Sequence, residues 1–370
     1  TSNINTPNTS NTNTNTNNDN GTSFGYPSSI YKCKDKSTCS NIVLRRFDNM
    51  KSTTAIVSHV MTQWQPLINS NYIVPLHSIH YDKKNSNAIY FVYNYFPLAK
   101  SIKEYYIYSN NFINTITLTD TTNTNSNSNN SEAVSHHTCT NITILWNMFA
   151  QLVIGMRDIH INHNNAIRTV DINHILVTNP IPTLGNTSNT NNTNTNNTNS
   201  NDTLYTTLRY NCVGILDVLE VESRKTVIEM QKDDIFKLAQ VLITVGLRLP
   251  TPTVSKTTLL EQHYPYFRLL YEHLDGGDAL CDLLYKMLHY KCSTIEDLST
   301  DVSLLPYIYH EIDAISKNND ILYNALGREY ENGRIARLLM KLGFVNERPL
   351  GNGSSTSGGS ESDGWSDTGD

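Results

Sequence analysis

Apolar and polar residues alternate in short runs over residues 22–100, which predicts a small lobe rich in strands. The runs "SIYKC" and "NIVLRRF" are separated by the polar turn "KDKST", and "YIVPLHSIHYD" and "NAIYFVYNYF" are separated by "KKNSN". Between the two pairs, residues 53–67 place apolar side chains at steps of three and four, the period of a helix. The predicted order is strands, one helix, then strands.

The pattern changes to helical spacing beyond residue 140. Three segments carry apolar residues on one helical face: "ILWNMFAQLVIGMRDIH", "DDIFKLAQVLITVGLRL", which we expect to open at Asp234, and "DALCDLLYKMLHY". Two further apolar runs, "HILVT" and "LRYNCVGILDV", are predicted strands. Periodicity alone therefore predicts an α+β body with two lobes.

Three tracts of Asn, Thr and Ser interrupt this pattern, at residues 1–20, roughly 118–135 and 186–204. Such tracts bury too little apolar surface to offset the entropy of ordering them, so we predict that they are disordered. The third tract falls between the two strand runs of the second lobe, as an enlarged hairpin loop would.

Composition narrows the function classes. The net charge of −6 and a pI near 6.0 do not indicate a general nucleic-acid binder, although Arg334–Arg348 could form a local basic face. The six cysteines show neither a C-x-x-C pair nor zinc spacing, so we expect reduced thiols in a cytoplasmic protein. No stretch approaches the roughly 18 apolar residues of a membrane span. No metal is expected, either at His136, His137 and Cys139 or at His160 and His163.

The order of elements is that of a protein kinase, yet the residues that would transfer a phosphoryl group are replaced. No glycine lies between Gly25 and Gly155 to form a phosphate cradle, and the lysine position on the third strand holds Arg45, with no glutamate before Glu104 to pair with it.

The loop "AIRTVDINHILVT" shows the same loss. Aligned on H-R-D-x-x-x-x-N, it keeps Arg168, but Thr169 replaces the base aspartate and His174 the metal-binding asparagine, while D-F-G becomes "CVG" at residues 212–214. Threonine cannot act as a carboxylate base. We predict a pseudokinase without catalysis; the alternative is an active kinase that takes its base from elsewhere.

At these positions the chain resembles the pseudokinase of the regulatory subunit of the poly(A)-nuclease (PAN) deadenylase complex. The segments that carry the resemblance are "FGYPSSIYKC", "VLRRFD", "FVYNYFPLAKSI", "RTVDINHILVT", "YNCVGILDVL" and "GREYENGRIARLLMKLGFVNERP". The resemblance implies a dimeric, non-catalytic adaptor that binds ATP without hydrolysing it. It also implies recruitment of the catalytic nuclease subunit to poly(A) RNA, for tail shortening and mRNA decay. A pseudokinase scaffold of another pathway is the alternative.

The resemblance also implies a domain order and a nucleotide site. The family's N-terminal region, with a zinc finger and a contact to poly(A)-binding protein, would be missing here. The domains would be 1–22 disordered, 23–300 pseudokinase with its two disordered insertions, 301–343 coiled coil, and 344–370 the start of a truncated C-terminal knob. The ATP contacts would be Arg45, Asn94, Tyr95, Phe96, Pro97, Leu98, Ala99, Lys100, Ser101, Asn173 and His174.

These assignments include one departure from the family's sequence and two positions with a simpler structural explanation. Asn173 and His174 depart from the family's usual Ser-Lys pair, and histidine is a weaker, titratable phosphate partner. Without the resemblance, Arg45 reads as a solvated strand arginine, and Tyr95 and Phe96 as ordinary interlobe core.

Beyond residue 301, seven positions fall at alternating steps of three and four: Leu305, Ile308, Ile312, Ile315, Asn319, Leu322 and Leu326. This is a heptad seam with Asn319 at an a position, where a buried amide favours a two-stranded register. We therefore predict a homodimer; a single amphipathic helix packed on the domain is the alternative. Glu329 and Gly333 interrupt the seam, so the regular coil should end or kink near Gly327.

Overall fold

The computed structural model describes residues 22–50, 52–82, 87–109, 113–119, 134–178, 206–220, 225–251, 255–292 and 294–346. The chain divides into two compact units, Thr1–Ala314 and Ile315–Asp370. The first Asn/Thr tract, the third, and most of the second lie outside the described residues, as does nearly all of the predicted knob segment.

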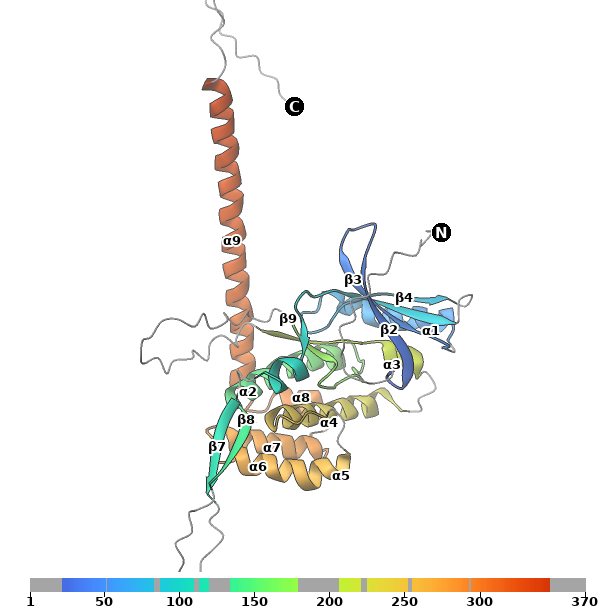
Figure 1. Cartoon of the computed structure of the whole chain (residues 1–370), viewed down its shortest axis with the longest axis vertical. Coiled ribbons are helices and arrows are strands. Elements are labelled where there is room, and N and C mark those ends of the chain that lie inside the picture. Colours follow the sequence, from blue (N-terminus) through green and yellow to red (C-terminus); the bar gives the residue numbers. More distant parts are fainter. Residues whose placement is uncertain are drawn as a thin grey trace, which may run out of the picture. The chain divides into compact units, whose positions relative to one another are not determined.

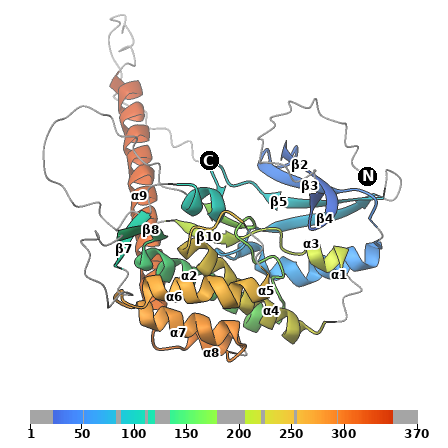
Figure 2. The ribbon, with the colours of Figure 1, turned by 60° about the horizontal axis from the view of Figure 1, so that its bottom comes forward.

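Among the described residues, the first lobe is a five-stranded antiparallel sheet with one helix (Figure 1). The four predicted strands and the predicted helix are present, and Thr22–Ser23 adds a short fifth strand. The strands follow the order β1-β2-β3-β5-β4. The helix α1 (Thr54–Trp64) begins where the Thr53 side chain accepts a hydrogen bond from the Ile56 amide, and it lies along one face of the sheet (Figure 2). The strands are β1 (Thr22–Ser23), β2 (Tyr26–Lys34), β3 (Asn41–Phe47), β4 (Leu76–Asp82) and β5 (Ala88–Asn94).

The second lobe is mainly helical and carries two small antiparallel sheets. One sheet, in the order β10-β9-β6, pairs the two strands that flank the third Asn/Thr tract, as predicted for an enlarged hairpin. Its strands are β6 (Lys100–Ser101), β9 (Ile175–Thr178) and β10 (Thr207–Tyr210); the second sheet joins β7 (Ile113–Thr119) and β8 (Val134–Thr140). The helices are α2 (Ile142–Arg157), α3 (Ile215–Leu219), α4 (Val227–Gly246), α5 (Lys256–Thr258), α6 (Tyr264–Tyr271), α7 (Gly277–Leu288) and α8 (Ile295–Ser299).

Three details of the sequence prediction are wrong. The run "LRYNCVGILDV" is a strand only to Tyr210, because Cys212 and Gly214 have positive φ and turn the chain into α3. Helix α4 opens before Asp234, at Val227, where Thr226 and Glu229 form a capping box. The tract predicted as disordered over 118–135 overlaps the strand ends of β7 and β8.

Helix α9 (Leu305–Asn346) is longer than the predicted seam and runs through Gly327 without ending there. Its first turns belong to the first compact unit, which extends past the predicted boundary at residue 300 to Ala314. The Tyr307 ring stacks on Trp146 at a centroid distance of 4.7 Å, and Ile308 packs against the core. The early seam position Ile308 is therefore partly covered within the chain, whereas Leu322 and Leu326 are 59% and 60% exposed.

Candidate functional site

The loop that corresponds to a kinase catalytic loop is held by a buried carboxylate. Asp234 on α4 accepts hydrogen bonds from the backbone amides of Ile167 at 2.6 Å and Arg168 at 2.8 Å. It also lies 3.2 Å from Nε2 of His160, whose side chain is almost completely buried. Since these groups are buried or, at Arg168, partly buried, the backbone of the loop is held by hydrogen bonds that do not involve the residues that would perform chemistry.

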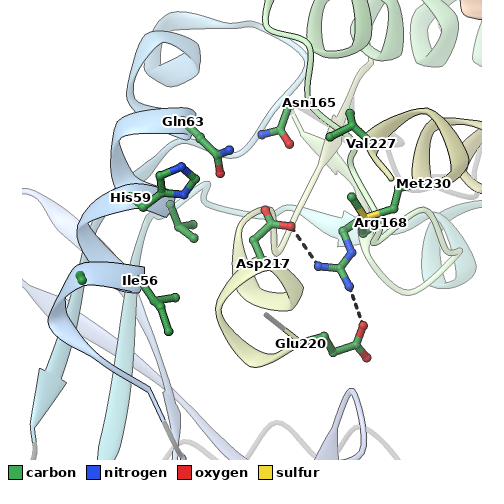
Figure 3. A pocket seen from close by; sticks show the side chains of 11 residues that line it. Ile56, His59, Gln63, Asn165, Arg168, Asp217, Glu220, Val227 and Met230 are labelled. Atoms are coloured by element: carbon green, nitrogen blue, oxygen red, sulfur yellow. Dashed lines mark hydrogen bonds and ion pairs between the residues drawn. The ribbon is translucent and has the colours of Figure 1, made fainter. Parts of the chain in front are cut away.

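Arg168 forms ion pairs with two carboxylates of the same chain (Figure 3). Its guanidinium lies 3.1 Å from Asp217 on α3 and 2.6 Å from Glu220. Burial raises the pKa of Asp217, while hydrogen bonds from Trp64 and Arg168 oppose this rise. The same residues border an open groove of about 480 Å³, which is lined on the α1 side by Ile56, His59 and Gln63, among others.

The positions of the base and the metal ligands carry structural contacts instead. The Thr169 hydroxyl is buried and donates to the carbonyl of Asn211 at 3.0 Å. Cys212, at the D-F-G aspartate position, is buried, and burial raises the pKa of its thiol. One carboxylate in the loop was not identified from the sequence. Asp171 accepts a hydrogen bond from the backbone amide of Asn173 at 2.8 Å, and burial raises the pKa of Asp171. Asp171 thus closes a turn of the loop backbone.

The structure brings Arg45 and His174 into one electrostatic environment. Burial, with smaller contributions from the charges of Arg45 and Lys237, lowers the pKa of His174 to about 4, so its ring is neutral near pH 7. Phe24, at the turn between β1 and β2, stacks on His174 with ring centroids 4.6 Å apart. Arg45 donates to the hydroxyl of Ser23 at 2.9 Å in the same hairpin. Sequence reasoning missed Phe24, because only the fold places the hairpin turn beside the loop.

The predicted hinge connects the two lobes but contacts other side chains. Asn94 is the last residue of β5, and its backbone amide donates a hydrogen bond to the carbonyl of Pro75 at 3.1 Å. The Tyr95 ring lies 4.2 Å from Nζ of Lys32, and the Phe96 ring 4.7 Å from the guanidinium carbon of Arg209.

The remaining residues of the predicted site lie in a short strand or at the surface. Lys100 and Ser101 form β6 and pair with β9, while the amide of Ala99 donates to the carbonyl of Phe96. The exposed residues are Pro97, Leu98, Lys100 and Asn173. Arg45 is therefore a partly buried strand arginine rather than a solvated one. The hinge residues Tyr95 and Phe96 contact other side chains, Lys32 and Arg209.

Three general features bear on cofactors and environment. Among the described residues, no three His, Cys, Asp or Glu side chains are grouped so that they could hold a metal ion. All six cysteines are unpaired. Within the same part of the chain, no helix is both long and apolar enough to cross a membrane.

Comparison with known proteins supports the resemblance read from the sequence motifs. Residues 295–370 match the family described as the Pan3 C-terminal knob domain. A curated relative from Aspergillus fumigatus, "PAN2-PAN3 deadenylation complex subunit PAN3", is 25% identical over 331 residues, which are 89% of this chain and 42% of the relative. The chain thus spans less than half of that relative's length.

Solved structures give the same result for the fold. The Neurospora crassa PAN3 pseudokinase superposes with a TM-score of 0.62 at 23% identity, covering 90% of this chain and 70% of that one. A complex of Neurospora crassa PAN2 (WD40-CS1) with PAN3 matches with a TM-score of 0.61 at 22% identity, covering 88% and 68%. The prediction of a kinase-like fold is confirmed, as is the resemblance to the PAN regulatory subunit.

Proposed function

We propose that this chain is part of a non-catalytic regulatory subunit of a cytoplasmic poly(A) deadenylase. The observation that carries the proposal is the match of residues 295–370 to the Pan3 C-terminal knob domain, on a chain whose remaining residues have a PAN3-like pseudokinase fold. The replaced base and metal ligands support a scaffold, because Thr169 and Cys212 make buried structural contacts and offer no group for phosphoryl transfer.

The scaffold binds ATP between the lobes without hydrolysing it. Arg45 supplies a positive charge beside the loop, and the hinge Asn94–Ser101 supplies the interlobe connection at which an adenine would lie. His174 is neutral near pH 7, so it contributes at most a single N–H donor to a phosphate. Affinity is therefore modest, because one guanidinium replaces the glycine-rich loop, the lysine and the metal of an active kinase.

Two copies of the chain associate through α9. Leu322 and Leu326 are more than half exposed on a helix of 42 residues, and apolar side chains at heptad spacing are buried by a partner helix in other proteins. The catalytic nuclease subunit binds beyond this seam, where exposed Ile335, Leu338 and Leu342 alternate with basic residues. The dimer brings that nuclease to poly(A) RNA.

Co-purification with the catalytic nuclease subunit, followed by a poly(A)-shortening assay, tests the proposal. We expect a stable complex and faster shortening than with the nuclease alone. A variant with Leu338→Asp and Leu342→Asp changes the proposed contact, and it should abolish co-purification while leaving the pseudokinase body folded. Failure of the unmodified chain to bind the nuclease would favour a pseudokinase scaffold of another pathway.

A further inference from the structure

An open groove lies between α1 and the start of α4 (Figure 3). Its volume is about 480 Å³, within the range of about 300–1,000 Å³ that is common for ligand sites. Ala55, His59 and Gln63 line it along α1, and because they recur at every fourth residue they share one face of the helix. Among the described residues, none of the predicted ATP contacts lines this groove, which we call the α1 groove.

The walls of the α1 groove are largely apolar. Ile56 lies on the α1 side, and Val227 and Met230 lie on the α4 side, all of them partly exposed. Ile228, next to Val227 at the start of α4, is 62% exposed. The face of α1 from Ala55 to Gln63 is about 12 Å long, which is the length of about four residues of extended chain. The groove therefore has the dimensions and the apolar walls to hold a short segment of polypeptide.

A buried amide beside the groove lacks a partner. Oδ1 of Asn165 accepts a hydrogen bond from the backbone amide of Ala166 at 2.9 Å. Nδ2 of Asn165 is buried and, within the described part of the chain, has no hydrogen-bond partner. Figure 3 shows this amide facing Gln63 across the groove. Since a buried donor without an acceptor is unfavourable, a carbonyl of a bound molecule would stabilise it. Extended chains have free carbonyls, whereas the carbonyls of a helix are bonded internally.

Two carboxylates give the α1 groove an excess of negative charge. Asp217 and Glu220 both pair with the guanidinium of Arg168, at 3.1 and 2.6 Å, so two negative charges share one positive charge. The Glu220 side chain is 47% exposed and accessible to a second cation. Lys225, which follows closely in the sequence, pairs with Asp233 instead. The charge that complements the groove is therefore a basic side chain from another molecule.

We propose that the α1 groove binds an extended segment of a partner protein in which apolar residues flank an arginine or a lysine. The apolar side chains pack against Ile56 and Met230, a backbone carbonyl accepts a hydrogen bond from Nδ2 of Asn165, and the basic side chain pairs with Glu220. A phosphorylated segment does not fit, because Arg168 is already paired with two carboxylates. The groove shares no residue with the nuclease contact proposed on α9, so this docking function goes beyond the proposed function.

A positional-scanning library of acetylated hexapeptides, with four variable positions between terminal glycines, tests the groove on the full chain. We expect selection of arginine or lysine at one position and of leucine, isoleucine, valine or methionine beside it. The selected hexapeptide, carrying a fluorescent label, is then the probe for variants by fluorescence anisotropy. Its affinity should fall as the salt concentration rises, because salt screens the pair with Glu220.

Two variants with matched controls test the charge and the shape of the groove. Glu220→Lys should weaken binding of the selected hexapeptide at least tenfold, whereas Glu261→Lys makes the same change in net charge at an exposed position elsewhere and should have no effect. His59→Trp fills the middle of the groove and should also weaken binding at least tenfold. Its control is Ser58→Trp, at an exposed neighbour that does not line the groove. Thermal unfolding of each variant separates loss of binding from loss of fold.

Four results would overturn the proposal. They are a library without selection, selection of acidic residues, equal affinity in the Glu220 and Glu261 variants, and equally strong binding by oligolysine, which lacks apolar side chains. A peptide affinity that falls as the chain is concentrated would assign the groove to a second copy of the chain and reject the partner segment. A chain that co-purifies with the nuclease yet selects no peptide would reject the groove and leave the proposed function standing.

Discussion

Nε1 of Trp64 donates a hydrogen bond to Oδ2 of Asp217 at 2.8 Å, and so joins the helix of the first lobe to the second. The other oxygen of Asp217 lies 3.1 Å from Arg168 in the catalytic-loop frame. In many kinases, arginines order the activation segment by pairing with a phosphorylated residue. Here Asp217 and Glu220 of the same chain pair with Arg168, so this link between the lobes needs no phosphate.

Replacing Asp217 by Ala should therefore destabilise the two-lobed domain strongly. The change leaves the Trp64 indole without its acceptor and removes one of the two carboxylates from Arg168, for an expected loss of roughly 2–4 kcal/mol. Asp233→Ala is the control, since it breaks an exposed pair with Lys225, worth about 0–1 kcal/mol. Urea denaturation, followed by tryptophan fluorescence, measures both. Equal losses in the two variants would contradict the link.

The buried carboxyl of Glu311 should make stability depend on pH. It lies 3.2 Å from Nε2 of Gln151, and burial raises its pKa to about 7. Because the pKa is higher in the folded than in the unfolded state, stability should fall as the pH rises through the range from about 4.5 to 7, by roughly 1–3 kcal/mol.

Two variants of α9 isolate this contribution. Glu311→Gln should remove the fall, whereas Glu329→Gln, at an exposed position of the same helix, should keep it. The measurement is the free energy of unfolding at several pH values from about 4 to 8, which cover the predicted range. If both variants give the same profile, Glu311 is not the group responsible.

Arg45→Ala should weaken ATP binding at least tenfold, because a hydrogen bond to a charged group contributes about 1.5–3 kcal/mol. Arg46→Ala is the control: alternate strand residues face opposite sides of the sheet, and Arg46 pairs with Asp48 at 2.7 Å. The pKa of His174 is lowered to about 4, so its charge should not make the affinity vary between about pH 6 and 8. Titration calorimetry measures each value. No heat with the unmodified chain, or equal loss in the two variants, would contradict nucleotide binding at Arg45.

The sequence predicted the elements whose signal is local. Strands β2 to β5 and helices α1, α2 and α7 follow from apolar periodicity, and the missing glycines and carboxylates follow from motif positions alone. Helix α6 was missed, because it begins at a Tyr-Pro pair and its apolar face is short. The early start of α4 was missed because Gln231 and Lys232, which lie between the apolar residues of the first turn and Ile235, are polar and interrupt the apolar stripe.

The contacts of the site depend on pairs that are distant along the chain. Trp64 and Asp217 are 153 residues apart, and Gln151 and Glu311 are 160 apart. No periodicity relates such positions, so only the fold shows that an indole or a carboxyl has a buried partner. Phe24 and His174 form a pair of the same kind.

Aspartates placed in the exposed part of the α9 seam should give a monomer. Leu322→Asp with Leu326→Asp puts charges where a second helix would bury leucine, and burying unpaired carboxylates costs more than the contact stabilises. Ile321→Asp is the matched control, because Ile321 is exposed at a c position on the opposite side of the helix. Light scattering across a concentration series should show a dimer for the unmodified chain and the control, and a monomer for the seam variant. Ile312→Asp with Leu322→Asp extends the test towards the base of the helix, whereas Ile308 is unsuitable because it packs within its own chain. A seam variant that stays dimeric would refute the coil and assign the exposed leucines to another partner.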